Sequence, residues 1–347
     1  MPENQPKSGL IGLINKLPKF MQRQLLGIGF LQRMETYITD LPGMLPMLDE
    51  HNNQTPELIA ELIQRGIGKA QSVFIDIDGV LLHALYLPPT NGKLICAFHG
   101  IKGNWLNNPP ALNPGSEDTD YNPRYRMLLL EEFARDGFGF LAFTLPGFNP
   151  SQGTASEANF AKACDAFADY TKDLALKSGI PAQDIIICGE SLGGAAAAIF
   201  AAKLTEKGFP PSVVSLIASF DSLISMTQNE FPIFTKDELT NALSDQLDTT
   251  KTLRALDRKK TWIHIVAAEG DTIIPIQNTM NLLEAARGLG FNVLYHPTPG
   301  KHTTWDTKTV VSGKKITHMA REKGIEIAEH QTVLDIEGMI AALDNKE

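Results

Sequence analysis

The sequence predicts an open α/β sheet, mostly parallel, with helices covering both of its faces. Two runs rich in β-branched and apolar residues, 72–78 and 80–87, flank an Asp78-Gly79 pair, which is a strong signal for a hairpin. Further along, short apolar runs alternate with longer segments of helical periodicity as far as His296. Alternation of this kind builds parallel strands joined by helices that cross over the sheet.

The remaining elements are expected in a regular order along the chain. After the hairpin, strands are expected at 93–98, 137–143, 185–188, 213–219, 261–267 and 291–296. Helices are expected at 56–65, 125–136, 156–178, directly after residue 194, within 236–255 as short pieces, and at 276–289.

The segment between the sixth and seventh strands, about 221–258, is too short for a large lid domain, so we expect a short cap. Its apolar side chains could line an acyl pocket or simply pack, and packing is the favoured interpretation for most of them. These side chains are Leu223, Met226, Phe231, Phe234 and Leu239.

The two ends of the chain differ from its middle. We expect a helical extension over 1–65, a main domain over 66–347, and a tail over 306–347 that covers the last strand or serves as an export signal. Apolar residues recur at helical spacing over 8–34, but charged residues and Pro18 interrupt them and rule out a continuous membrane span. This basic segment either makes peripheral contact with an anionic membrane surface or packs on the main domain, which we favour.

Composition narrows the class of protein. With 43% hydrophobic and 20% charged residues, the 347-residue chain is typical of a soluble globular enzyme. A net charge of −9 argues against nucleic acid as a partner, because phosphate binding needs clustered Lys and Arg. The cysteines Cys96, Cys164 and Cys188 show neither zinc-binding spacing nor a disulfide framework. Without a signal peptide in view, we expect a cytoplasmic protein.

The clearest chemical signal lies at the fifth strand. The apolar run 185–188 leads into Gly189-Glu190-Ser191-Leu192-Gly193-Gly194, and an alanine-rich helical segment follows. Strand, G-x-S-x-G and helix together form the context of a nucleophile elbow, in which a sharp, strained turn projects the serine. We therefore predict that Ser191 is a nucleophile; the competing interpretation is a glycine-rich turn with an incidental serine.

A nucleophilic serine needs a base and an acid that orients the base. With a nucleophile elbow the chain order is serine, acid, histidine. Asp271 lies in the loop after the seventh strand and is favoured as the acid over Glu269. His302 lies in a glycine-containing loop just past the last strand, where α/β sheets bind their ligands, and is the predicted base. The other histidines after Asp271 fall in the last strand or the tail: His296, His318 and His330.

Backbone N–H groups should bind the oxyanion. Leu192, directly after the serine, is one predicted donor, and Ile101, in the loop after the third strand, is the second, with Lys102 as the fallback. The side chain of His99 is expected to brace this loop rather than to act as an acid or base.

Taken together, these motifs resemble an α/β-hydrolase. The resemblance covers about 72–305 and is greatest for the branch with an H-G-x-x-G-N loop, near the serine peptidase and dienelactone-hydrolase types. It rests on His99–Asn104, Gly147–Gly153, Thr154–Glu157, Gly189–Gly194, Gly270-Asp271 and Gly300–Trp305. It implies an α/β-hydrolase fold and a serine hydrolase that needs no cofactor. The turn 145–149 departs from the family, whose members usually carry an arginine and a second glycine there.

The expected activity is cleavage of a carboxylic ester, thioester or lipid acyl bond through an acyl-enzyme, with a small-molecule or lipid ester as substrate. A peptidase or acyltransferase that uses the same triad is the alternative. A non-catalytic binding protein is disfavoured because all three triad positions are filled. No metal site is expected.

Overall fold

A computed structural model describes residues 48, 52–101, 105, 125–230, 232–243, 245–268, 270–298 and 302. Most of the predicted N-terminal extension, including 8–34, and the predicted tail 306–347 lie outside the described residues. Peripheral membrane contact through 8–34 therefore stays a prediction. No helix among the described residues combines the length and the apolar character needed to cross a membrane.

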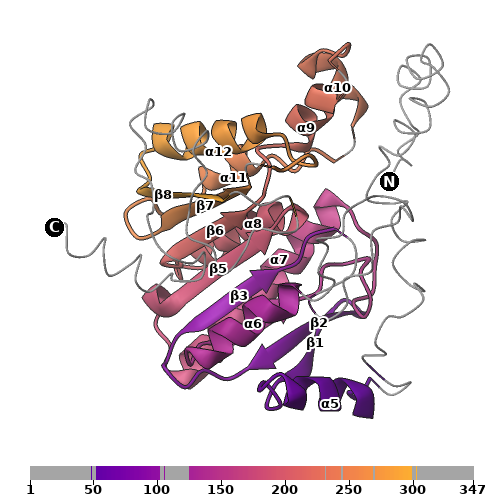
Figure 1. The fold of residues 1–347 in the computed structure, drawn as a ribbon, viewed down its shortest axis with the longest axis vertical. Helices are drawn as coiled ribbons and strands as arrows, with labels where there is room; N and C mark the ends of the chain where they lie inside the picture. The colour runs from indigo at the N-terminus through magenta and orange to yellow at the C-terminus, as the bar shows by residue number, and fades with distance from the viewer. Residues whose placement is uncertain are drawn as a thin grey trace.

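A single eight-stranded sheet runs through the described chain in the order β1-β2-β4-β3-β5-β6-β7-β8 (Figure 1). The strands are β1 Gln71–Ile77, β2 Val80–Leu87, β3 Leu94–Phe98, β4 Gly139–Phe143, β5 Ile185–Glu190, β6 Val213–Ile217, β7 Trp262–Ala268 and β8 Val293–Thr298. Strand β2 is antiparallel to β1 and β4, and all other neighbours are parallel. The mostly parallel sheet predicted from the sequence is confirmed.

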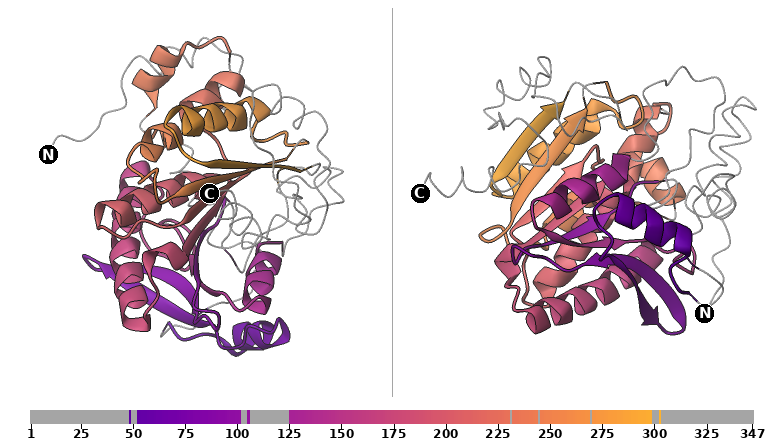
Figure 2. Two further views of the ribbon diagram at one scale, coloured as in Figure 1. Left: turned by 90° about the vertical axis from the view of Figure 1, so that its left-hand side faces the viewer. Right: turned by 60° about the horizontal axis from the view of Figure 1, so that its bottom comes forward.

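Helices cover both faces of this sheet (Figure 2). They are α5 Pro56–Gln64, α6 Tyr125–Arg135, α7 Glu157–Ser178, the 3-10 turn η2 Ala182–Asp184, α8 Leu192–Glu206, α9 Leu223–Glu230, α10 Lys236–Ala242, α11 Thr249–Leu253 and α12 Ile276–Gly288. Apolar residues of α7, α8, α11 and α12 share one core cluster with one face of the sheet. Those of α5 and α6 share a second cluster with the opposite face. Leu58 and Leu62 of α5 are buried in it, so α5 belongs to the same folded unit as the strands.

Local sequence explains where these elements begin and end. The β1–β2 turn places Asp78 and Gly79 at φ 53° and 85°, which is the left-handed pair that a two-residue hairpin turn needs. Ser156 caps α7 by accepting a hydrogen bond from the Asn159 N–H, and Gly179 ends the helix in the left-handed conformation. Such caps satisfy backbone groups that a helix terminus otherwise leaves without a partner.

The insert between β6 and β7 is short, as predicted, and its helices α9 and α10 project beyond the edge of the molecule's layers (Figure 1). We did not predict α9; the signal was Ser222, whose hydroxyl caps it by accepting from the Ser225 N–H. Of the apolar residues proposed to pack or to line a pocket, Leu223 and Met226 pack on the main core, and Phe234 and Leu239 are buried. Phe231 lies outside the described residues.

Two carboxylates fasten the insert to the main domain. Glu157, at the start of α7, accepts hydrogen bonds from the backbone N–H groups of Gln246 and Leu247 at 2.6 and 3.1 Å. Asp221, just past β6, accepts from Asn278 Nδ2 at 2.6 Å and from Asn281 Nδ2 at 3.0 Å, both on α12. The insert is thus anchored at its start and again just after α10.

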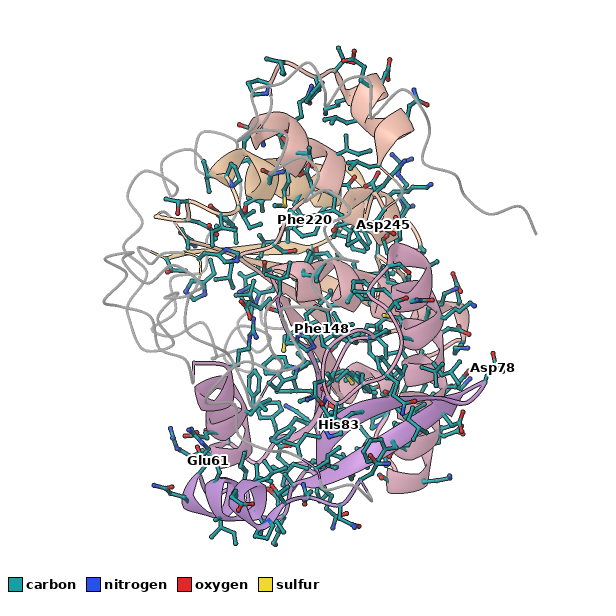
Figure 3. The ribbon with its side chains drawn as sticks, turned by 90° about the vertical axis from the view of Figure 1, so that its right-hand side faces the viewer. Glu61, Asp78, His83, Phe148, Phe220 and Asp245 are labelled. Carbon is teal, nitrogen blue, oxygen red and sulfur yellow. The ribbon has the colours of Figure 1, made fainter. Side chains whose placement is uncertain are left out.

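A buried histidine on β2 links stability to pH. His83 Nδ1 lies 3.2 Å from Thr144 Oγ1 and its Nε2 lies 3.0 Å from Ser72 Oγ. Figure 3 shows His83 well inside the packed side chains, whereas Asp78 lies at the outer tip of the hairpin. Burial lowers the pKa of His83 from its ordinary 6.5 to about 3.

This pKa predicts a measurable loss of stability in mild acid. Between pH 6.5 and 3 the unfolded chain binds a proton at His83 that the folded chain does not, so stability must fall as the pH falls. From pH 7 to pH 5 this group should cost about 2 kcal/mol of unfolding free energy. In urea unfolding at the two pH values, His83→Gln should lose about 2 kcal/mol less than the wild-type protein. Equal losses in the two proteins would contradict this assignment.

Candidate active site

Ser191 occupies the turn between β5 and α8 in a conformation that few residues adopt. Its φ of 52° and ψ of −117° lie outside the regions that an L-residue normally occupies, as expected for a nucleophile elbow. Two hydrogen bonds to β6 and the loop after it hold the turn: the Ser191 N–H donates to the Ile217 carbonyl at 2.8 Å, and Ser219 Oγ donates to the Ser191 carbonyl at 3.0 Å. The surrounding strands therefore maintain the strain.

Glycines make this turn possible because the backbone segments lie nearly in contact. A Cβ on Gly189 would lie 2.1 Å from the Gly193 carbonyl oxygen, and a Cβ on Gly193 would lie 2.3 Å from the Phe98 carbonyl oxygen. Neither oxygen belongs to a side chain that could rotate away. Only glycine therefore fits at these two positions without a shift of the backbone.

We expect Gly193→Ala to destabilise the protein by about 3 kcal/mol or more, since the added methyl group forces β3 and α8 apart. Gly288→Ala is the matched control, because a Cβ at Gly288, in the last turn of α12, meets nothing within 4 Å. It should be neutral or slightly stabilising, as alanine is the better helix former. Chemical denaturation of both variants checks the pair, and similar stability of the two would contradict the packing argument.

The structure brings Ser191, Asp271 and His302 together from three separate loops. His302 Nε2 lies 3.0 Å from Ser191 Oγ, and His302 Nδ1 lies 2.8 Å from Asp271 Oδ2. All three side chains are buried. A carboxylate can only accept, so Nδ1 carries the ring proton and Nε2 is free to accept the hydroxyl proton of the serine. The geometry is that of a nucleophile, a base and an orienting acid.

The loop after β7 holds the Asp271 carboxylate in place. Its Oδ1 accepts hydrogen bonds from the backbone N–H groups of Ile273 and Ile274, both at 2.8 Å. The second oxygen is thereby left to face His302. Glu269, the competing acid in the sequence, lies outside the described residues.

The two predicted oxyanion donors follow neighbouring strands of the sheet. Leu192 is the first residue of α8, whose N-terminal N–H groups carry partial positive charge. Ile101 follows β3, the strand adjacent to β5 in the sheet. The fallback donor, Lys102, lies outside the described residues. The oxyanion-binding role of Ile101 and Leu192 remains a prediction.

His99 braces the loop after β3, in agreement with the role expected for it. Its Nδ1 donates to the Gly100 carbonyl at 2.8 Å, and its Nε2 accepts from the Leu145 N–H at 3.1 Å. Burial, and secondarily the nearby Arg126 guanidinium, lower the pKa of His99 to about 3. The ring therefore stays neutral at neutral pH, and both of its nitrogens are occupied by backbone partners.

Two charged residues next to the serine were not singled out from the sequence. Glu190, which precedes Ser191, forms a buried ion pair with Arg126 of α6, with Arg126 Nε 2.7 Å from Glu190 Oε2. The two residues are 64 positions apart, and no spacing pattern connects them. Among the described residues, no group of three or more His, Cys, Asp or Glu side chains is arranged to hold a metal ion.

Comparison with known proteins finds similarity in structure only. No family model and no curated protein sequence matches the chain. An α/β-hydrolase from Vibrio vulnificus superposes with a TM-score of 0.54 and 20% identity, over 78% of this chain and 86% of its own. An esterase from Pyrococcus furiosus superposes with a TM-score of 0.51 and 14% identity, over 81% of this chain and 95% of its own. Together with the strand order, these likenesses show that the chain has the α/β-hydrolase fold.

Proposed function

We propose that this protein is a serine hydrolase that cleaves a carboxylic ester, thioester or lipid acyl bond. The observation that carries the proposal is the continuous chain of hydrogen bonds from Ser191 Oγ through His302 to Asp271, at 3.0 and 2.8 Å. The fold by itself does not establish an activity, since proteins with the same fold have many different functions. The Pyrococcus furiosus protein with a similar fold is named an esterase, which supports the choice of ester chemistry.

In the proposed reaction, Ser191 Oγ attacks the acyl carbonyl carbon while His302 Nε2 takes the hydroxyl proton. Asp271 holds the protonated ring in place and offsets its charge. His302 then gives the proton to the departing alcohol or thiol, which leaves an acyl group on Ser191. A water molecule, deprotonated by the same nitrogen, attacks this acyl-enzyme, and His302 returns the proton to Ser191 Oγ as the acid is released.

The negative charge that develops on the carbonyl oxygen needs donors that are already in place. We assign this role to the backbone N–H groups of Ile101 and Leu192, each worth about 3 kcal/mol of transition-state stabilisation. Leu192 combines its own N–H with the positive end of the α8 dipole.

The test is chemical labelling of the native protein together with an ester screen. A fluorophosphonate probe should modify the wild-type chain, and mass spectrometry of the digested protein should place the adduct on Ser191. A series of p-nitrophenyl esters of increasing chain length should show turnover and reveal the preferred acyl length. Absence of turnover together with no adduct on Ser191 would overturn the proposal.

A further inference from the structure

The ion pair between Arg126 and Glu190 lies against the loop that carries a proposed oxyanion donor. Besides its bond to Glu190, Arg126 Nη2 donates to the Ile101 carbonyl at 3.2 Å. A Cβ on Gly100 would lie 2.9 Å from Glu190 Oε1 and 3.0 Å from Arg126 Nη2, so the pair packs directly on the Gly100 backbone. One guanidinium thus joins the residue before the nucleophile to the loop after β3.

We propose that Arg126 and Glu190 are positioning residues that hold the oxyanion-binding loop 99–101 in register with Ser191. This inference rests on the proposed function. Glu190 is the last residue of β5, so its place relative to Ser191 is fixed by the chain itself. Arg126 binds both Glu190 and the Ile101 carbonyl, so it fixes the position of Ile101 relative to Ser191.

Peptide geometry explains how side chains on this loop can aim a backbone donor. The C=O and N–H groups of a trans peptide lie in one plane and point in opposite directions. The Gly100 carbonyl accepts from His99 Nδ1, which sets the plane that also contains the Ile101 N–H. Arg126 holds the next carbonyl, that of Ile101, so the plane cannot rotate freely about its other end.

A second set of contacts holds the start of the loop. The His99 ring packs edge-on against Phe148 with their centroids 4.8 Å apart, and its Nε2 accepts from the Leu145 N–H. The loop after β4 and the helix α6 therefore both hold residues 99–101. Precise placement matters, because a displacement of about 1 Å can lower the rate about a hundredfold.

Charge neutrality is the second function of the pair. The side chains of both Arg126 and Glu190 are only 3% exposed, so neither charge is screened by water. An unpaired Glu190 carboxylate beside Gly100 would repel the negative charge that develops on the substrate oxygen. An arginine suits the position because its planar fork can bond Glu190 and the Ile101 carbonyl at once, whereas a lysine offers a single nitrogen.

The experiment compares Arg126→Lys with the same substitution in a second arginine–glutamate cluster, which lies far from the site. In wild-type protein, phenylboronic acid should add to Ser191 Oγ as a tetrahedral adduct that mimics the transition state, with the serine proton passing to His302. In Arg126→Lys, we expect kcat on a p-nitrophenyl ester to fall between about tenfold and a hundredfold with KM nearly unchanged. The inhibition constant of phenylboronic acid should rise by a similar factor.

Arg65→Lys is the matched control. Arg65 joins Glu61 of α5 to Glu131 of α6 and is largely buried, so its loss disturbs the same helix α6 without touching the loop 99–101. Its kcat and inhibition constant should equal those of the wild-type protein. If Arg126→Lys does not fold, the neutral pair Arg126→Gln/Glu190→Gln replaces it, with the same expected losses.

The outcomes separate this inference from the proposed function. If the wild-type protein hydrolyses esters and a folded Arg126 variant keeps the wild-type kcat and boronate affinity, only the positioning role is overturned. A loss of kcat that Arg65→Lys shares equally also overturns it, because the effect is then one of general stability. A wild-type protein that neither hydrolyses esters nor binds phenylboronic acid overturns the proposed function and this inference with it.

Discussion

Replacing Ser191 by alanine should lower kcat on the preferred p-nitrophenyl ester by about a million-fold and abolish labelling by a fluorophosphonate probe. The hydroxyl oxygen is the atom that forms the acyl-enzyme, and alanine offers no nucleophile at this position. The loss should appear in kcat at saturating ester, because substrate contacts with the rest of the site remain.

The control for this variant is Ser212→Ala. Ser212 lies at the opposite end of the same pair of strands, where its hydroxyl donates to the Ile185 carbonyl at 3.1 Å. Its removal should leave activity and labelling at the wild-type level. Circular dichroism should show both variants folded. More than about 1% of wild-type activity in Ser191→Ala would indicate another nucleophile, since the expected loss is far greater.

The fold was predictable because its signals are local and repeated. The Asp78-Gly79 turn, the buried apolar strands and the capped helix α7 each follow from a few adjacent residues. Right-handed crossover connections then leave few ways to join the strands. Helix α9 was missed because its eight residues are too short for a clear apolar period.

The candidate site, too, has residues that could be predicted from the sequence and residues that could not. Ser191, Asp271 and His302 follow strand ends, and the carboxyl ends of parallel strands meet at one edge of the sheet. Their juxtaposition could therefore be inferred from topology. Arg126 lies inside a helix, and its contact with Glu190 depends on how α6 crosses the sheet, which no local pattern encodes. The same holds for Glu157, which reaches the backbone of the insert from the start of α7.

Buried charge next to the serine has a consequence for electrostatics. Glu190 and Arg126 cancel each other, and burial keeps His99 neutral, with its pKa lowered to about 3. The Asp271 carboxylate, 2.8 Å from His302 Nδ1, is therefore the charge that the structure directs at the imidazole. Because this pair is buried, the carboxylate stabilises the imidazolium more strongly than it would in water.

Asp271→Asn should lower kcat about ten-thousandfold, because the surrounding loop forces the new amide into the wrong orientation. The backbone N–H groups of Ile273 and Ile274 both donate to Oδ1, and they require an oxygen at that position. The asparagine NH₂ group must then face His302 Nδ1, which can bond it only as an acceptor. His302 would carry its proton on Nε2, and it could no longer accept the proton of Ser191.

Glu269→Gln is the comparison that separates the two acids of this loop. If Asp271 orients His302, as its 2.8 Å contact with Nδ1 indicates, the glutamine variant should keep its wild-type kcat. The decisive measurement is kcat for both variants on one ester between pH 6 and 9, together with thermal unfolding. A large loss in Glu269→Gln and a small one in Asp271→Asn would assign the acid to Glu269. A large loss in Asp271→Asn and none in Glu269→Gln would assign the acid to Asp271. The backbone N–H groups of Ile273 and Ile274 would then contribute to catalysis, because they bind Oδ1 and leave Oδ2 to face His302.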